Sequence, residues 1–280
     1  GLMTNNTITA INGIRVGHTT SEAGMTGCTV ILCPPNTIGG VDQRGGAPGT
    51  RETDLLSPMH LVENVHAIAL SGGSAYGLSV ADGVMRYCEE NGIGHPVPPF
   101  VVPIVPTAIL MDLYMGDPAI RPNADMGYQA CVSATTDPVM QGNIGAGMGC
   151  RIGGMFGNAS ATKGGLGSAL IDLGDGLLVG ALVAVNAVGD IIDETGNILG
   201  GIRNPDGSFM GMMNVMRGMA RMVLPASGNT VIGTIVTNAK LTKEGVNKVA
   251  QMAQDGLARA ICPTHTLFDG DTVFALATND

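Results

Sequence analysis

Apolar residues along this chain form short runs, which are separated by glycine-rich turns and by longer segments with helical spacing. The runs 66–70, 230–237 and 272–278 are rich in aliphatic and β-branched residues and predict buried strands. Two longer segments, 75–90 and 242–261, predict helices, and the first of them ends at an Asn-Gly pair. This mixture of strands and helices favours a layered α/β fold.

The remaining pattern adds hairpins and further helical segments. Residues 165–190 alternate glycine with aliphatic residues around Asp175-Gly176, which is typical of a hairpin with a two-residue turn. Residues 39–54 show no clear period and are expected to be irregular. The other expected elements are strands within 8–32, a helix over 122–136 and a partly helical, methionine-rich stretch over 203–223. No internal repeat interrupts the chain, so we expect one domain over residues 1–280.

Composition excludes several classes of protein. Hydrophobic residues make up 45% of the chain and charged residues 13%, which excludes intrinsic disorder. The net charge is −9 and no Lys/Arg cluster occurs, so we expect no nucleic-acid partner and no binding to an anionic membrane. The longest uncharged stretch, 95–111, contains five prolines, which argues against a membrane-spanning helix. We therefore expect a cytoplasmic protein.

The cysteine and histidine spacings do not indicate a metal site. Six cysteines occur without a CxxC pair, and five histidines occur without HxxxH or HExxH spacing. Free thiols and scattered histidines are the simplest interpretation, and neither a metal nor an organic cofactor is expected.

Candidate chemistry gathers at the two C-terminal strands. A strand–helix–strand connection normally makes its two strands parallel, so both should begin at the same edge of the sheet. This topology predicts that Thr230 lies near Asp269 and Asp271. Such a juxtaposition arises in any protein with this topology, so it does not by itself establish catalysis.

The peptide bond before Thr230 carries a more specific possibility. The hydroxyl of Thr230 can attack the carbonyl of Asn229 in an N-to-O acyl shift. Hydrolysis of the resulting ester would leave Thr230 at a new N-terminus. An α-amine has a pKa of about 8, so it can act as the base for the hydroxyl of its own residue.

Several segments resemble one family of self-processing hydrolases. They are Gly13–His18, Asp42–Gly49, Ser71–Gly77, Gly145–Met148, Gly228–Ile232 and His265–Phe274. On these motifs, which extend over nearly the whole chain, the protein resembles the L-aminopeptidase/D-esterase family (peptidase family S58), which includes the nylon-oligomer hydrolases. The resemblance implies an α-β-β-α sandwich of the N-terminal-nucleophile-like, aminopeptidase/ornithine acetyltransferase type. It also implies a homotetramer.

The same resemblance assigns roles to individual residues. It implies cleavage between Asn229 and Thr230 into an α chain of residues 1–229 and a β chain of residues 230–280, with Thr230 as the nucleophile. Asn186 matches an asparagine that the family uses near the nucleophile. Its NH₂ group either helps to stabilise an oxyanion or is an ordinary buried amide.

The paired carboxylates and one turn also admit two interpretations each. Asp269 and Asp271 repel each other, so one of them can hold a proton and relay it to the nucleophile. A turn or a metal pair is the alternative. The turn formed by Gly72, Gly73 and Ser74 either packs its backbone against a substrate amide or is a plain tight turn.

Two positions depart from the family pattern. Gly153-Gly154 occupies the place where the family often has a Gly-Lys pair, and Lys163 is the nearest substitute. Met111 replaces a tyrosine of the nylon-oligomer branch. Both changes affect the expected rate of processing and the choice of substrate.

These observations predict a self-processing hydrolase that acts on amide or ester bonds. The substrate would be a small peptide, a linear amide such as a 6-aminohexanoate oligomer, or an ester. An acyltransferase like the ornithine acetyltransferases is the alternative within enzymes. A non-catalytic oligomer whose processing has decayed is the alternative outside them.

Overall fold

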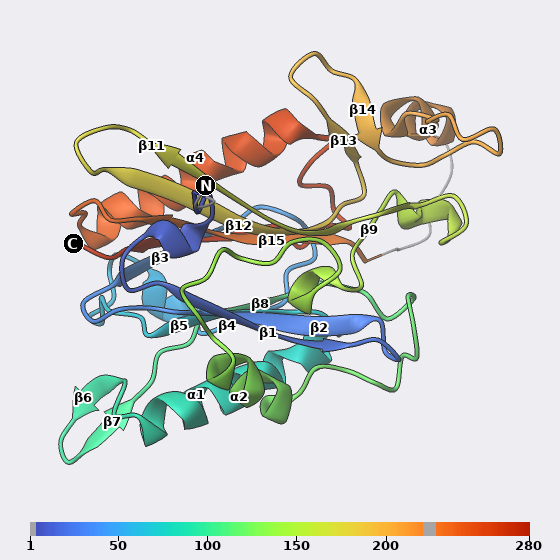
Figure 1. The fold of residues 1–280 in the computed structure, drawn as a ribbon. Coiled ribbons are helices and arrows are strands. Elements are labelled where there is room, and N and C mark those ends of the chain that lie inside the picture. Colours follow the sequence, from blue (N-terminus) through green and yellow to red (C-terminus); the bar gives the residue numbers. More distant parts are fainter. Residues whose placement is uncertain (1–3, 221–227) are drawn as a thin grey trace.

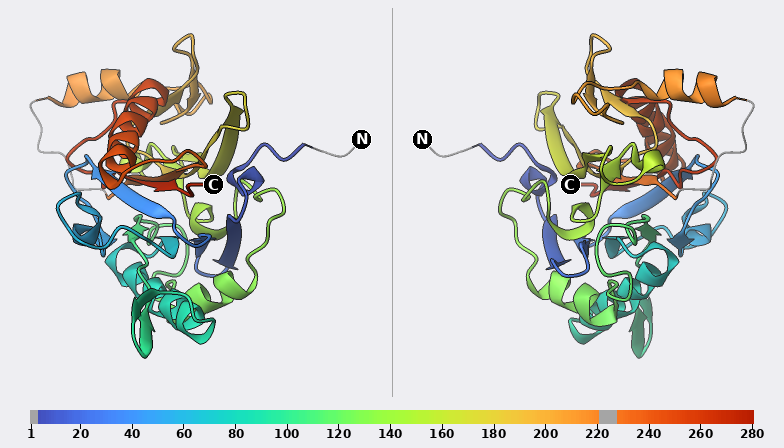
Figure 2. Two further views of the ribbon diagram at one scale, coloured as in Figure 1. Left: turned by 90° about the vertical axis from the view of Figure 1, so that its left-hand side faces the viewer. Right: turned by 90° about the vertical axis from the view of Figure 1, so that its right-hand side faces the viewer.

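Two five-stranded sheets lie face to face between outer helices in the computed structural model, which describes residues 4–220 and 228–280 (Figure 1). Helices α1 (Val80–Glu90) and α2 (Ala124–Val132) cover the first sheet, and α4 (Lys243–Ala260) covers the second. The turned views show these helices on opposite outer faces of the paired sheets (Figure 2). This arrangement confirms the expected α-β-β-α sandwich.

The first sheet has the strand order β1-β2-β5-β8-β4. The bounds of these strands, in that order, are Arg15–Ser21, Thr26–Leu32, Ala67–Ser71, Thr107–Ile109 and Thr50–Arg51. Strands β1 and β2 form the hairpin expected within residues 8–32, and β5 runs parallel to β8. Strand β5 is followed by the glycine turn, a 3₁₀ segment (Ser74–Ser79) and α1.

The second sheet has the strand order β11-β12-β15-β17-β3. The bounds of these strands, in that order, are Gly165–Asp172, Leu178–Asn186, Thr230–Thr237, Thr272–Ala277 and Ile38–Gln43. Strands β15 and β17 are parallel, and α4 is the crossover between them. The predicted strand–helix–strand unit is therefore confirmed, and it places β15 in the middle of the sheet.

Shorter elements complete the described chain. The remaining strands are β6 (His95–Val97), β7 (Phe100–Val102), β9 (Arg151–Ile152), β10 (Thr162–Lys163), β13 (Asp190–Ile192), β14 (Ile198–Gly200) and β16 (Ile261–Cys262). The further 3₁₀ segments are Ile8–Ala10, Asp54–Leu56, Gly145–Gly147 and Gly154–Phe156. Helix α3 (Met212–Met219) lies beside β14 at one end of the molecule (Figure 1).

The main hydrophobic core fills the space between the two sheets. Ile31 and Ile68 of the first sheet and Leu182, Ile232 and Phe274 of the second are all fully buried in this cluster. A second cluster lies between the first sheet and the helices α1 and α2. Burial of this kind is the dominant favourable term in folding, so these clusters hold the layers of the fold together.

The structure corrects two expectations from the sequence, and a third extends beyond the described residues. Residues 39–54 are not wholly irregular, because β3 pairs with β17 and β4 pairs with β8. The helix expected over 122–136 is shorter, since α2 ends at Val132. Part of the methionine-rich stretch 203–223 forms α3, and positions 221–223 lie outside the described residues. Within the described ranges, no helix is long and apolar enough to cross a membrane.

Candidate functional site

Thr230 is the first residue of β15, and its side chain is buried against the peptide bond that precedes it. The hydroxyl Oγ1 donates a hydrogen bond to the carbonyl oxygen of Asn229 at 2.5 Å. The backbone N–H of Gly270 donates to that same carbonyl oxygen at 3.1 Å and to Thr230 Oγ1 at 3.1 Å. The hydroxyl of Thr230 and the N–H of Gly270 thus both contact the carbonyl group of Asn229.

The strand ends meet as the topology predicts. Asn229 and Asp269 form a parallel bridge, and Asn229 N–H donates to the carbonyl oxygen of Phe268 at 3.1 Å. The N–H of Val231 donates to Asp271 Oδ1 at 2.9 Å. These contacts bring both aspartates beside Thr230 and confirm the predicted proximity.

The carboxyl group of Asp269 is held by three donors in the protein. Its Oδ2 accepts hydrogen bonds from the N–H of Thr266 at 3.1 Å and from the hydroxyl of Thr266 at 2.7 Å, and its Oδ1 accepts from the N–H of Val188 at 3.4 Å. Burial, together with the nearby charge of Asp271, raises the pKa of Asp269 to about 6. Asp269 can therefore hold or release a proton near neutral pH.

Asp271 is paired with a histidine that the sequence left unassigned. Its Oδ2 lies 2.8 Å from Nδ1 of His265 and accepts the backbone N–H of His265 at 3.1 Å. His265 has a positive φ of 54°, so the backbone turns back on itself to bring both groups onto one oxygen. In the described part of the chain this contact with a histidine side chain distinguishes Asp271 from Asp269, whose carboxyl oxygens accept from Thr266 and Val188.

The loop before β4 closes over the carboxylate segment. The N–H of Arg44 donates to the carbonyl oxygen of Asp271, and the N–H of Ala47 donates to that of Asp269, both at 2.9 Å. A Cβ on Gly45 would lie 2.0 Å from the carbonyl oxygen of Asp269. The glycine of this motif is therefore required by a close backbone approach.

Asn186 is the last residue of β12 and lies directly opposite Thr230 in the sheet. Its Oδ1 accepts a hydrogen bond from the N–H of Arg151 at 2.9 Å, and its Nδ2 donates to the carbonyl oxygen of Met111 at 2.9 Å. The structure therefore places the fully buried amide at the site, where it ties two neighbouring segments together. Its role toward an oxyanion stays a prediction.

Lys163 is not hydrogen-bonded to Thr230 in the part of the chain that the structure describes. Its ammonium group donates to the carbonyl oxygens of Gly147 at 3.1 Å and Gly164 at 3.0 Å. Although the residue as a whole is exposed, the loss of water around its ammonium group lowers the pKa of Lys163. A direct catalytic role for this lysine stays a prediction.

The backbone N–H groups of the turn at residues 72–74 are all bonded within the protein. Those of Gly72, Gly73 and Ser74 donate to Gly27 O, Asp112 Oδ1 and Leu110 O at 2.7 to 2.9 Å. Because these donors are already occupied, the substrate role predicted for this turn would have to use other atoms of it.

Asp112 is a site residue that the sequence did not reveal. It is buried, and its Oδ2 accepts a hydrogen bond from the hydroxyl of Thr26 at 2.6 Å. Burial raises the pKa of Asp112 to about 6, and the charge of Lys163 opposes this shift. Asp112 follows Met111, whose carbonyl binds Asn186, so it links the glycine turn to the site. No local motif marks it, because its partners come from distant segments.

Gly154, where the resemblance leads us to expect a lysine, packs against the side chain of Arg151. A Cβ on Gly154 would lie 2.2 Å from Nε of Arg151. The guanidinium of Arg151 is buried over the ring of Tyr114 and donates to Asn158 Oδ1. The side chain of Arg151 thus occupies the space beside residue 154, and it would have to move to admit a side chain there.

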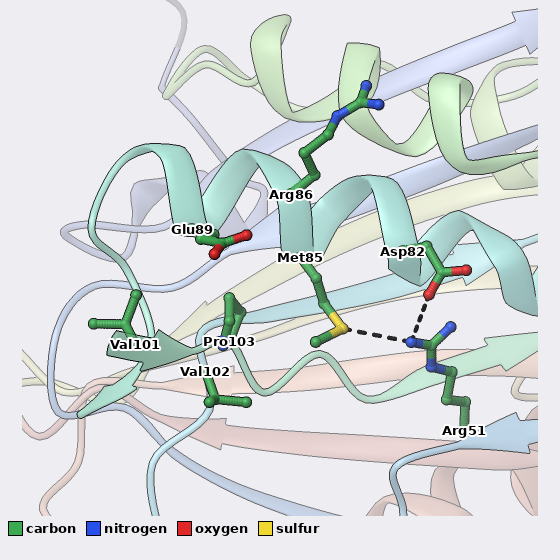
Figure 3. A pocket seen from close by; sticks show the side chains of 8 residues that line it. All are labelled: Arg51, Asp82, Met85, Arg86, Glu89, Val101, Val102 and Pro103. Carbon is green, nitrogen blue, oxygen red and sulfur yellow. Dashed lines mark hydrogen bonds and ion pairs between the residues drawn. The ribbon is translucent and has the colours of Figure 1, made fainter. Parts of the chain in front are cut away.

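A surface hollow of about 400 Å³ lies apart from this cluster, between α1 and β7 (Figure 3). Its Arg51 is already paired with Asp82 at 2.7 Å, and none of its lining residues belongs to the Thr230 cluster. Among the described residues, no group of three His, Cys, Asp or Glu side chains is placed to hold a metal ion. The chemistry of the described chain therefore gathers at the start of β15.

The layered sandwich of the described chain has the fold of N-terminal-nucleophile hydrolases. The fold matches the L-aminopeptidase D-Ala-esterase/amidase of Ochrobactrum anthropi, described as a variant of that fold. The TM-score is 0.71 over 98% of this chain and 74% of that one. The sequence identity there is 20%, so this likeness concerns the fold.

The family is shown by the sequence comparisons. The model of peptidase family S58 matches residues 6–280, and the chain belongs to that family. It is 46% identical to an uncharacterized aminopeptidase of Mycobacterium leprae over 98% of this chain and 78% of that protein. It is 32% identical to the 6-aminohexanoate-oligomer endohydrolase of Paenarthrobacter ureafaciens over 96% of this chain and 74% of that protein. The protein is therefore a hydrolase of amide bonds.

Proposed function

We propose that the chain cleaves itself between Asn229 and Thr230 and then hydrolyses amides with Thr230 as its nucleophile. The observation that carries this proposal is the contact of 2.5 Å between Thr230 Oγ1 and the carbonyl oxygen of Asn229, to which Gly270 N–H also donates. In the uncleaved chain the hydroxyl of Thr230 thus contacts the carbonyl group that it would attack.

Self-cleavage then proceeds by an acyl shift. Thr230 Oγ1 loses its proton and bonds to the carbonyl carbon of Asn229, while the Gly270 N–H stabilises the charge on the carbonyl oxygen. The C–N bond breaks as the nitrogen of Thr230 takes up the proton that Oγ1 has lost, which leaves an ester and a free amine. Water hydrolyses that ester, so the products are residues 1–229 with a new carboxylate and residues 230–280 with a free amine.

The mature site uses the same threonine. Its α-amine, with a pKa of about 8, serves as the base for Oγ1, which attacks the substrate carbonyl and forms an acyl-enzyme. Asp269, whose pKa is raised to about 6, is the candidate for holding or releasing a proton near neutral pH, and Asp271 with His265 holds the strand end in place. Asn186 and Lys163 are the remaining candidates for stabilising the oxyanion.

The substrate class follows from the relatives. One of them is named an aminopeptidase and the other a 6-aminohexanoate-oligomer endohydrolase. We therefore propose short linear amides, either aminoacyl amides or 6-aminohexanoate oligomers. The family match favours hydrolysis over the acyltransferase alternative, and product analysis with an added amine acceptor separates the two.

Substitution of Thr230 tests the mechanism. We expect Thr230→Ala to give one intact mass of 28.5 kDa under denaturing conditions and no turnover of alanine p-nitroanilide or 6-aminohexanoate trimer. Thr230→Ser keeps a hydroxyl and should retain both reactions. Thr234→Ala is the matched control, since Thr234 is also buried on the same strand. Cleavage or turnover by Thr230→Ala at the rate of the unsubstituted protein would refute the proposal.

We also propose that the protein assembles as a homotetramer. Large apolar side chains are exposed on the described surface, among them Met59 and Leu61, each 92% exposed, and Leu267, 80% exposed. Single exposed apolar side chains are ordinary on protein surfaces, so the proposal of a tetramer rests on the family resemblance. Native mass spectrometry should show four copies, and a monomer at micromolar concentration would exclude the tetramer. The cytoplasmic location expected from the sequence stays a prediction.

A further inference from the structure

We propose that a cavity at the end of the first sheet away from Thr230 binds a small carboxylate with a short apolar body. The cavity has a volume of about 610 Å³, and its wall combines one guanidinium and two imidazole rings with apolar groups. Volumes of roughly 300–1,000 Å³ are typical of small-molecule sites. This proposal does not depend on the proposed function of Thr230.

The charge of the cavity favours an anion. Arg15, His66 and His95 line it, and its described wall contains no aspartate or glutamate. Arg15 forms no ion pair with any described residue, although the chain as a whole has a net charge of −9. A guanidinium without a carboxylate partner is well suited to bind a carboxylate through two parallel hydrogen bonds.

The orientation of His66 adds a second donor. The backbone N–H of Ile104 donates to Nδ1 of His66 at 3.0 Å. Because Nδ1 accepts a hydrogen bond, the neutral ring carries its proton on Nε2. His66 can therefore donate to an anion without first becoming charged, while Arg15 supplies the positive charge.

The rest of the wall favours an organic ligand over a simple inorganic ion. Pro34, Pro35, Ile93 and Pro96 contribute apolar surface to the same cavity. An ion such as phosphate would contact the basic end and leave these side chains uncovered. A carboxylate with an aliphatic or aromatic body would bind at the basic end and bury its apolar part against the prolines.

The cavity is built from regular elements that fix its shape. Arg15 begins β1, and His95 pairs with Val102 in the β6–β7 hairpin. The N–H of Cys33 donates to the carbonyl oxygen of His66 at 3.1 Å, which ties the end of β2 to the start of β5. Ligand pockets are usually preformed in this way, so binding requires little reorganisation.

Strand β2 separates this cavity from the candidate active site. Its first residue, Thr26, binds Asp112, and its last, Leu32, adjoins the cavity residue Cys33. Seven residues of strand span about 20 Å. A ligand in this cavity therefore does not occupy the site at Thr230.

Isothermal titration calorimetry with sodium hexanoate tests the proposal on the full-length protein. We expect saturable binding, at least a tenfold loss of affinity in Arg15→Gln, and a smaller loss in His95→Gln, which lies on a different element. Arg259→Gln is the matched control, because it removes one exposed positive charge at the end of α4 and should bind within twofold of the unsubstituted protein. Thermal unfolding midpoints verify that each variant is folded.

Two further probes identify the ligand class. Hexylamine has the same apolar body with the opposite charge and should not bind, and inorganic phosphate should bind at least tenfold more weakly than hexanoate. If folded Arg15→Gln and His95→Gln both bound hexanoate as tightly as the unsubstituted protein, the proposal would be overturned, since the ligand would then bind elsewhere. Equal binding of hexylamine or phosphate would overturn the proposed class, and the absence of any binding heat together with no shift in the unfolding midpoint would overturn the site.

Discussion

Gly270 contacts both the hydroxyl of Thr230 and the carbonyl group of Asn229 at the candidate site. Its N–H donates to the carbonyl oxygen of Asn229 and to Thr230 Oγ1. A Cβ at this position would lie 2.8 Å from Thr230 Oγ1 and 2.4 Å from the carbonyl oxygen of Ala47. A side chain here would therefore displace the hydroxyl or the surrounding loop, which explains glycine between the two aspartates.

The raised pKa of Asp269 predicts a pH dependence of stability. The carboxyl ionises near 3.8 in the unfolded chain and near 6 in the folded one, so between these values the folded state holds a proton that the unfolded state has released. Stability therefore falls as the pH rises from about 4 to about 6, and the contribution of Asp269 changes by about 3 kcal/mol over this window.

The free energy of unfolding, from urea titrations at several pH values, checks this dependence. Asp269→Asn removes the titrating group, so its stability relative to the unsubstituted protein should rise by about 3 kcal/mol between pH 4 and pH 6.5. Asp175→Asn, on an exposed turn, should leave the pH profile unchanged. Parallel profiles for Asp269→Asn and the unsubstituted protein would show that another group carries the dependence.

The candidate site could be predicted from sequence only where strand ends define it. Thr230, Asp269 and Asp271 follow from the parallel connection, because residues at the starts of adjacent parallel strands are neighbours. Asp112 and the pairing of His265 with Asp271 could not be predicted, since their contacts depend on how separate loops fold over those ends. The hydrogen bonds of Lys163 likewise depend on carbonyl groups that no side-chain pattern reveals.

At the scale of elements, local patterns predicted strands with their own apolar signal and missed several that depend on long-range pairing, among them β3, β4 and β8. Strand β15 matches its predicted bounds, and α4 begins one residue after Thr242, whose side chain caps the helix. Strand β3 was missed because its two glycines disfavour a strand locally. A Cβ on Gly40 would lie 2.8 Å from the backbone of Asn247, so the close approach of α4 requires glycine there.

Helices α1 and α2 make a close contact that predicts the effect of a single methyl group. A Cβ on Gly83 would lie 1.6 Å from the carbonyl oxygen of Ala124, so Gly83→Ala must push the helices apart. Overpacking of this kind costs about 3 kcal/mol, which we expect as a lower midpoint in thermal unfolding.

Gly256→Ala is the matched control for this prediction. Gly256 lies in the interior of α4 and is exposed, and no heavy atom lies within 4 Å of the place that a Cβ would take. Alanine should therefore raise stability by about 0.5–1 kcal/mol through its better helix propensity. An unchanged midpoint for Gly83→Ala would show that the helices can separate without cost.

At the scale of the whole molecule, the sheet order predicts that the two fragments remain together after cleavage. After the proposed cleavage, β15 would begin the β chain and lie between β12 of the α chain and β17 of its own chain. The β chain also supplies Phe274 and Ile232 to the main core. Separation would expose that core and break the ladder with β12, so the cut protein should behave as one folded unit.

Size-exclusion chromatography followed by denaturing electrophoresis checks this prediction. We expect both fragments in a single native peak, with the same elution volume as the uncleaved Thr230→Ala variant. Partial cleavage gives an internal comparison, because cut and intact chains should elute together. Elution of residues 230–280 in a separate peak would contradict the prediction that the fragments stay together.

The central position of β15 also affects how well the protein would refold after the proposed cleavage. Before the cut, folding is intramolecular, and an unfolded molecule can return to the native sheet alone. After the cut, the same sheet must be rebuilt from two separate polypeptides, so recovery becomes bimolecular and slows as the protein is diluted. The lifetime of the mature enzyme would then be set by its rate of unfolding, which makes its durability kinetic in origin.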